Sequence, residues 1–173
     1  MSFDKILYFP SSERAIQLHE YLSKTSFFED PASTKFHLCY VGGLAEHTVN
    51  MTANLQLLTD RMNIKWMYDD SPIIVGMCHD LCKVGAYVRM LDGSYRHNSK
   101  HPEGHGKLSI EVARRIIDLS WEEEYCIAYH MGNWTKEIDM MEDKSYTEAI
   151  EDHPNILFTH TADMMATFID EVF

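Results

Sequence analysis

The sequence has little positive charge, few cysteines and no long apolar run. It holds 15 lysine and arginine residues against 27 aspartate and glutamate residues, which gives a formal net charge of −12. Extended contact with a nucleic-acid backbone depends on clustered basic residues, so this balance disfavours a polymeric nucleic acid as ligand. A small anionic ligand stays compatible with it, because bound metal cations can make a pocket locally positive.

The four cysteines, at positions 39, 78, 82 and 126, form no Cys-x-x-Cys pair. The beginning of the chain lacks the cationic stretch and apolar run of a signal peptide. No apolar stretch approaches the roughly 20 residues that span a bilayer. We therefore expect a protein of the reducing cytoplasm with no membrane span, in which each cysteine is a small buried apolar residue.

Low-complexity tracts and internal repeats are absent as well, which favours a single domain over residues 1–173. Apolar residues recur at helical spacing along most of the chain and predict an all-α bundle. A small β-hairpin is expected within residues 86–97, where the pattern alternates around Asp92-Gly93. The predicted helices include 15–22, 44–62, 71–80, 104–119, 120–131 and 154–172, with loops at 25–43 and 133–145.

Three helix starts carry a chemical signal. Ser11 or Ser12 can cap the first helix with its hydroxyl. Ser71-Pro72 is typical of a helix start, with serine as the cap and proline in the first turn. Ser120 and Glu123 have the spacing of a capping box, which predicts that a helix begins directly after Ser120.

Five of the predicted helices each bring histidine or aspartate into an otherwise apolar pattern. One such histidine is weak evidence, because a lone core histidine is more often hydrogen-bonded than metal-bound. An unpaired carboxylate at Asp80 would cost several kcal/mol in the interior, so a cation or hydrogen-bond donors must accompany it. The cores of helical bundles are where metal sites of imidazole and carboxylate are built. The residues concerned are His47, His79, Asp80, His105, His130, His160 and Asp163.

These residues stand in five short motifs within residues 42–163. The motifs are Gly42-Gly43-Leu44-Ala45-Glu46-His47-Thr48, His79-Asp80-Leu81-Cys82-Lys83, Gly104-His105-Gly106, Tyr129-His130-Met131-Gly132 and Thr161-Ala162-Asp163. In this order they resemble the ligand motifs of the HD superfamily of metal-dependent phosphohydrolases, whose fold is a helical bundle. The first motif is similar to that of the HD module in bacterial exoribonucleases and of related stand-alone HD hydrolases, but we expect no separate nucleic-acid-binding domain within these 173 residues.

The resemblance implies six ligands for two divalent transition-metal ions. The first ion would be held by His47, His79, Asp80 and Asp163, and Asp80 would bridge to a second ion at His105 and His130. Imidazole and carboxylate ligands suit Mn, Fe, Co, Ni or Zn. In an alternative arrangement, one ion is bound, and His105 and His130 contact the substrate.

Lys83 is expected to act beside this site. It lies one turn after His79, so the two side chains would share a helix face and the ammonium group could point at the same cavity. The resemblance gives Lys83 a contact with the substrate phosphate, and Asp80 with Lys83 forms the expected catalytic pair.

Other residues near the motifs are weaker candidates for substrate binding. Arg96 and Lys107 flank the third motif, where they either recognise an anion or lie in a solvated loop. His160, three residues before Asp163, either orients a ligand or substrate or is a hydrogen-bonded core histidine. Trp134, shortly after the fourth motif, either shapes the pocket or packs in the core.

The resemblance and the ligand set favour a metal-dependent phosphohydrolase. It would cleave a phosphomonoester or phosphodiester of a small nucleotide-like substrate by attack of metal-bound hydroxide. Two alternatives stay open. An HD-type diiron oxygenase uses nearly the same ligands, and a metal-bearing regulatory or binding module could retain them without turnover.

Overall fold

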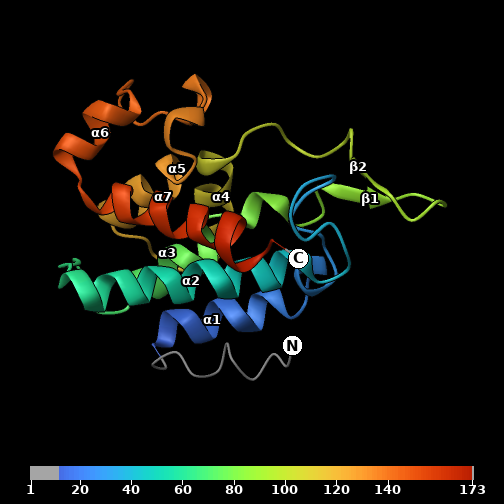
Figure 1. Cartoon of the computed structure of the whole chain (residues 1–173), viewed down its shortest axis with the longest axis horizontal. Helices are drawn as coiled ribbons and strands as arrows, with labels where there is room; N and C mark the ends of the chain where they lie inside the picture. Colours follow the sequence, from blue (N-terminus) through green and yellow to red (C-terminus); the bar gives the residue numbers. More distant parts are fainter. Residues whose placement is uncertain (1–11, 173) are drawn as a thin grey trace.

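The computed structural model describes residues 12–172, and in this part of the chain seven α-helices form the bundle shown in Figure 1. Their bounds are α1 Glu13–Leu22, α2 Gly43–Met62, α3 Ser71–Cys78, α4 Gly106–Ala113, α5 Trp121–Tyr129, α6 Tyr146–Asp152 and α7 Asn155–Met165. Strands β1 (Tyr87–Arg89) and β2 (Tyr95–His97) pair antiparallel in a hairpin that projects from one end of the bundle. The predicted all-α bundle with a hairpin near residues 86–97 is confirmed.

The hydrophobic core lies between α2, α3, α5 and α7. Helix α2 packs against α3 and α7, while α5 packs against α3, α4 and α7. Every one of the eight residues of α3 is buried, so this helix runs through the centre of the bundle. The residues that follow α3, beginning with His79, therefore start inside the core. Large core side chains include Leu44, Met51, Leu55, Ile73, Ile74, Ile127 and Ile156.

Two predicted helix starts differ in their outcome. The side chain of Ser12 accepts a backbone hydrogen bond and caps α1, whereas Ser11 lies outside the described residues. The prediction that Ser71 caps α3 was wrong, because Asp70 holds that position and Ser71 lies in the first turn. The Ser71 hydroxyl instead donates to Glu123 at 2.7 Å, which helps to satisfy a fully buried carboxylate.

The prediction that the central helix brings His79 and Asp80 into the interior is confirmed by their burial, but the helix was expected to extend too far. The helix ends at Cys78, and the backbone of Asp80 leaves helical geometry with φ −114° and ψ 20°. A 3₁₀ turn, η3 (Leu81–Lys83), follows. His79 and Asp80 are nevertheless buried, because the turn continues from the end of the central helix.

Helix α4 is shorter than the predicted 104–119 and begins after His105, which holds its N-cap position. Gly106 is required at this point. A Cβ atom there would lie 2.5 Å from the carbonyl oxygen of Ala128, so only glycine lets α4 approach α5 this closely. The close approach brings His105 beside His130, the residue that follows α5.

Helix α6 was not among the predicted helices, although the sequence contains its signal. Ser145 and Glu148 form a capping box at its start, as Ser120 and Glu123 do at the start of α5. The predicted box at Ser120 is confirmed. The same spacing at Ser145 would have placed a helix after it.

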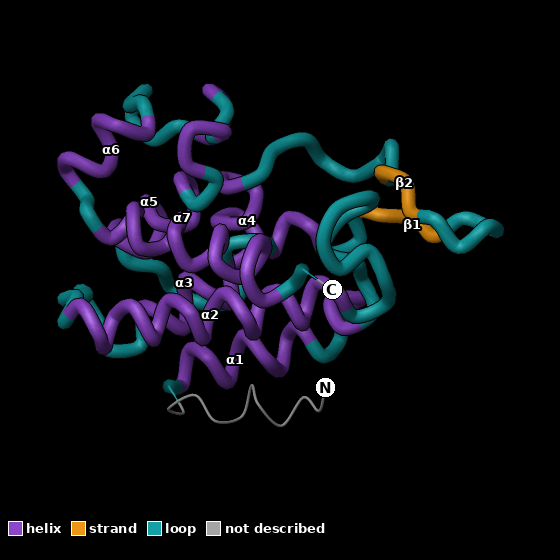
Figure 2. Tube along the Cα trace, in the orientation of Figure 1, coloured by secondary structure: helices purple, strands orange, loops and turns teal. Residues whose placement is uncertain are grey.

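The predicted helix at 154–172 is present but changes type along its length. Helix α7 passes into a π-helical segment, η6 (Ala166–Asp170), and the amide of Glu171 donates to the carbonyl of Ala166 at 3.1 Å. Figure 2 shows the loop between α1 and α2 at the same end of the molecule as the hairpin and the end of η6. Segments far apart in the sequence thus meet at that end.

The four cysteines are free thiols, and three of them, Cys78, Cys82 and Cys126, are buried as predicted. Cys39 is exposed, because it lies in the loop before α2 and not in a helix of the core. None of the helices in residues 12–172 combines the length and the apolar character that crossing a membrane would require.

Candidate metal centre

Four histidines and two aspartates from five parts of the chain converge at the end of α3. The Nε2 atoms of His47 and His79 lie 3.2 Å apart, and those of His105 and His130 lie 3.1 Å apart. Asp163 approaches His47 of the first pair, with its Oδ1 atom 3.1 Å from Nε2 of that histidine. All six predicted ligands therefore lie in one cluster, although no single helix carries more than one of the histidines.

Asp80 stands between the two histidine pairs. Its Oδ2 atom lies 3.5 Å from Nε2 of His47 and 3.3 Å from Nε2 of His79. Its Oδ1 atom lies 3.3 Å from Nε2 of His105 and 3.7 Å from Nε2 of His130. Each carboxylate oxygen thus faces one pair, which is the arrangement that a bridging carboxylate requires.

The outward nitrogen of each histidine has a partner that holds the ring in place. Nδ1 of His79 lies 2.8 Å from the carbonyl of Gly76, and Nδ1 of His130 lies 2.7 Å from the carbonyl of Ile127. Because a carbonyl only accepts, both rings carry hydrogen on Nδ1 and leave an Nε2 lone pair facing the cluster. Ligand histidines of metal sites are commonly fixed in this way.

The cluster fits a pair of divalent ions by its distances and by its unsatisfied atoms. Metal–nitrogen bonds of about 2.0 to 2.1 Å separate two nitrogen ligands of one ion by about 3.0 to 3.4 Å. Both histidine pairs fall in that range. Oδ1 of Asp80 is buried and accepts no hydrogen bond from the described part of the chain. A cation would satisfy this oxygen.

Burial and opposite charges shift the pKa values in the cluster in different directions. Burial lowers the pKa of His105 to about 3, so its imidazole is neutral at neutral pH. Burial opposes ionisation of Asp80, but the nearby charge of Lys83 holds the pKa of its carboxyl well below the usual range. Burial also opposes ionisation of Asp163, yet the hydrogen bond with His47 keeps its pKa low. These carboxylates are therefore available as anionic ligands.

Lys83 reaches the cluster from η3. Its Nζ atom lies 2.6 Å from Oδ2 of Asp80, and the Asp80 charge raises the pKa of this lysine despite its burial. The sequence spacing predicted Lys83 on the same helix face as His79. That reason was wrong, because α3 ends before Asp80. The 3₁₀ turn brings the ammonium group to the same place.

A cavity of about 950 Å³ opens directly onto the cluster. Of the six predicted ligands and Lys83, five line it, namely His47, Asp80, Lys83, His105 and Asp163. His160 and Trp134 also line it, and their rings lie 6.3 Å apart. Nδ1 of His160 donates to the carbonyl of His130 at 2.7 Å, so His160 joins the cavity wall to a predicted ligand.

Arg96 and Lys107 are not brought into this cavity. Arg96 is exposed on β2, and Lys107 lies in the first turn of α4, where its amide donates to Asp139. A second, more polar cavity of about 470 Å³ lies between the hairpin and the chain before α4, and it shares Lys83 and His105 with the first. Its lining does not include Arg96 or Lys107 either, so neither cavity supports a substrate contact by these two residues.

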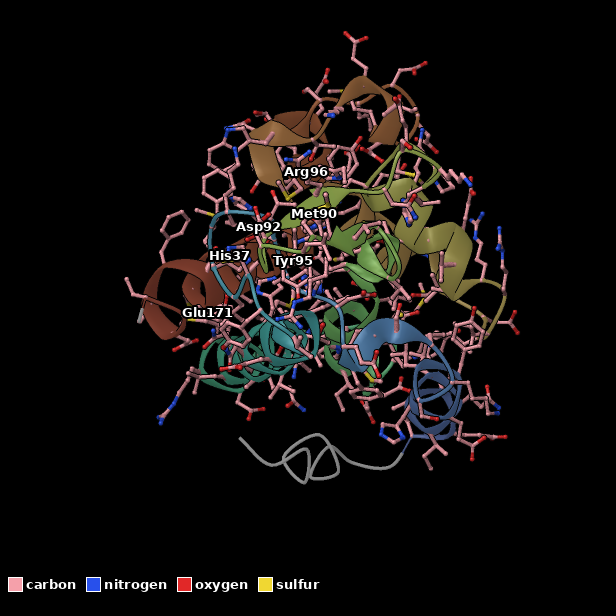
Figure 3. The ribbon with its side chains drawn as sticks, turned by 90° about the vertical axis from the view of Figure 1, so that its right-hand side faces the viewer. His37, Met90, Asp92, Tyr95, Arg96 and Glu171 are labelled. Atoms are coloured by element: carbon pink, nitrogen blue, oxygen red, sulfur yellow. The ribbon has the colours of Figure 1, made fainter. Side chains whose placement is uncertain are left out.

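Three residues near the cluster were missed in the sequence. Glu171 accepts a hydrogen bond from Nδ1 of His47 at 3.0 Å and another from Asn50 at 3.1 Å. His37 lies beside them, with its ring centroid 4.9 Å from that of His47 and its Nε2 atom 3.9 Å from Glu171. Figure 3 shows His37 and Glu171 near each other on the face from which the hairpin projects. Asn50 lies one turn after His47 on the same helix, and this spacing could have indicated that it lies near the site. Glu171 and His37 have no such relation to a predicted ligand within one helix.

Cys82 differs from the apolar role expected of it. Its Sγ atom lies 3.0 Å from Nδ1 of His105, and the two residues could share a cation with Asp80. Burial raises the pKa of the Cys82 thiol to about 12, so the group stays protonated. Without a bound cation, the protonated thiol of Cys82 is therefore placed to orient the ring of His105.

Comparison with known proteins gives one informative similarity. A protein of Methanocaldococcus jannaschii, named dihydroneopterin 2′,3′-cyclic phosphate phosphodiesterase, is 30% identical to this chain over 109 residues. Those residues make up 61% of this chain and 43% of that protein, so the chain spans less than half the length of this curated relative. No protein-family profile and no solved structure matches the chain.

Proposed function

We propose that the protein is a metal-dependent phosphodiesterase or phosphatase of the HD type that hydrolyses a small, nucleotide-like phosphate ester. The observation that carries this proposal is the position of Asp80 between two histidine pairs, each at a spacing that suits one ion. The similarity to a phosphodiesterase that acts on a cyclic phosphate supports the same reaction class.

Six residues would hold the ions: His47, His79, Asp80 and Asp163 the first, and Asp80, His105 and His130 the second. Two divalent ions bound there would lower the pKa of a water molecule and offset the charge of the phosphoryl oxygens. The protein contributes the geometry, because the carbonyls of Gly76 and Ile127 hold the rings of His79 and His130 before any ligand arrives.

Lys83 would bind a phosphate oxygen next to these ligands. Its ammonium group lies against Asp80 and lines the cavity, so a phosphate that enters the cavity comes within reach of it. His160, also on the cavity wall, would position the ester from the opposite element, α7. Because its Nδ1 atom donates to His130, its Nε2 atom is left as an acceptor for a substrate hydroxyl.

The test is hydrolysis by the full chain loaded in turn with Mn, Fe, Co, Ni or Zn. The panel contains 2′,3′-cyclic nucleotides, nucleoside monophosphates and bis(p-nitrophenyl) phosphate. We expect metal-dependent turnover that Asp80→Ala abolishes and that Asp60→Ala, an exposed carboxylate near the end of α2, leaves intact.

If none of these esters is hydrolysed while the protein binds iron and consumes oxygen, the diiron oxygenase would be the correct alternative. Absence of hydrolysis with bound metal and without oxygen uptake would favour the regulatory or binding module. Turnover that survives Asp80→Ala would show that the reaction takes place elsewhere in the protein.

A further inference from the structure

Large aromatic side chains remain exposed around the mouth of the 950 Å³ cavity, although folding usually buries such surface. Phe36 is 83% exposed, Trp134 66% and Phe168 64%, and all three line this cavity. They come from three separate segments, namely the loop before α2, the 3₁₀ turn η4 (Gly132–Trp134) and η6. Exposed apolar groups that gather at one cavity indicate a ligand-binding surface.

His37, beside Phe36, supplies the polar part of this surface. Both of its ring nitrogens are buried and have no hydrogen-bond partner in the described part of the chain. Its Nε2 atom is 3.9 Å from Glu171, which is too far for a hydrogen bond. A buried polar atom without a partner is unfavourable, so a ligand group that pairs with His37 would stabilise this site.

We propose that this surface, formed by Phe36, His37, Trp134 and Phe168 and called the wall below, binds a planar nitrogen heterocycle that belongs to the substrate. Aromatic side chains stack on the flat face of such a ring, and a neutral histidine can pair with its polar edge either as a donor or as an acceptor. A cavity of 950 Å³ has room for a molecule of nucleoside size. The inference rests on the proposed function, because the same molecule must bring a phosphate ester to Asp80 and Lys83.

Binding of the heterocycle is tested first without any reaction. Trp134 is one of three tryptophans in the chain, so guanosine or neopterin stacked on the wall should quench part of the fluorescence. We expect this quenching to disappear in Trp134→Phe and to persist in Trp121→Phe, whose indole is 51% exposed but lines no part of the cavity. Ribose without a base should not quench.

The contribution of each wall residue is measured by titration calorimetry with guanosine. Loss of one stacking partner in Phe36→Ala should weaken binding about 5- to 100-fold. His37→Phe keeps a ring but removes both nitrogens, and it should also weaken binding. Leu91→Ala, at the exposed tip of the hairpin, is the matched control and should bind like the unaltered protein.

Activity then links the wall to the reaction. Guanosine 2′,3′-cyclic phosphate and glycerol 1,2-cyclic phosphate present the same five-membered phosphodiester with and without a heterocycle. We expect a higher kcat/KM for the guanosine ester, and we expect Phe36→Ala to raise its KM without changing the kinetics of the glycerol ester.

The outcomes separate this inference from the proposed function. Equal kcat/KM for the two esters, or no quenching by guanosine or neopterin, would overturn the heterocycle-binding wall even if hydrolysis occurs. Quenching that depends on Trp134 in a protein that hydrolyses neither ester would support the wall and refute the hydrolase.

Discussion

Asp80 is the residue on which the arrangement of the cluster depends. Its two oxygens face different histidine pairs, so its removal would take a ligand from both candidate ion positions. His130, in contrast, approaches Oδ1 alone. This asymmetry allows the bridging role to be tested separately from activity.

We predict that Asp80→Ala empties both metal positions, whereas His130→Ala retains about one ion per chain because the ligands of the first position stay intact. Metal content after gel filtration, measured by elemental analysis, decides this. Asp60→Ala serves as the control. Full metal content in Asp80→Ala would contradict a bridging carboxylate, and full content in His130→Ala would favour the arrangement in which His130 contacts substrate.

Glu171 acts through His47 and is a positioning residue. Its carboxylate holds Nδ1 of His47 at 3.0 Å, and replacement of such a partner usually weakens metal affinity about 10- to 100-fold. We expect Glu171→Gln to show a loss of this size in a competition titration with a chelating dye. Asp170→Asn is the matched control, since Asp170 pairs with Asn54 at 2.7 Å and not with a predicted ligand. Equal metal affinities of the Glu171→Gln and Asp170→Asn variants would show that Glu171 does not position His47 for metal binding.

Among the elements, the contact of α4 with α5 decides where the second histidine pair lies. Gly106 begins α4 against the backbone of Ala128, and His105 and His130 flank the contact. The π-helical segment η6 has a comparable role on the other side, because the wider turn carries Glu171 to His47. Backbone geometry at these helix ends thus sets the position of the second histidine pair and fixes the ring of His47.

Gly106→Ala should therefore damage both stability and the second metal position. A methyl group 2.5 Å from the Ala128 carbonyl forces the two helices apart, and overpacking of this kind costs about 1 to 3 kcal/mol. We expect a lower free energy of unfolding in urea together with loss of about one ion per chain. Lys107→Ala, the next residue of α4, should change neither. Unchanged metal content in Gly106→Ala would show that the contact does not position His105.

At the scale of the whole molecule, the cluster concentrates polar groups in the centre of the bundle. His47, His79, Asp80 and His130 are all buried, and Oδ1 of Asp80 has no hydrogen bond from residues 12–172. Such a core is unfavourable until cations compensate it. Bound ions should therefore stabilise the entire fold.

Removal of metal by EDTA should lower the melting temperature. An ion at 100 times its Kd stabilises the folded state by about 2.7 kcal/mol. For a chain of this length, about 1 kcal/mol changes Tm by about 2 to 4 °C, so we expect a decrease of about 5 to 10 °C. Differential scanning calorimetry before and after addition of EDTA measures it. Asp80→Ala should show no such decrease, and an unchanged Tm in the unaltered protein would contradict a structural contribution of the ions.

Local patterns predicted much of this architecture. Apolar spacing placed α2 at nearly its observed bounds, and Asp92-Gly93 marked the hairpin, because helical and strand periods are properties of neighbouring residues. The same patterns extended α3 and α4 too far. At Asp80 and Gly106 the packing of other elements decides where the helix stops or starts, and a periodic pattern does not register such contacts.

By itself the sequence determined which residues have the chemistry of metal ligands and which segments are helical. Only the tertiary structure decided which atoms meet. His47 and Glu171 are 124 positions apart and hydrogen-bond because α2 packs against α7 and η6. The His37 nitrogens, which find no partner within residues 12–172, and the exposed Trp134 are likewise results of folding. So is the position of Asp80 between two histidine pairs, since burial and distance arise between elements and not within them.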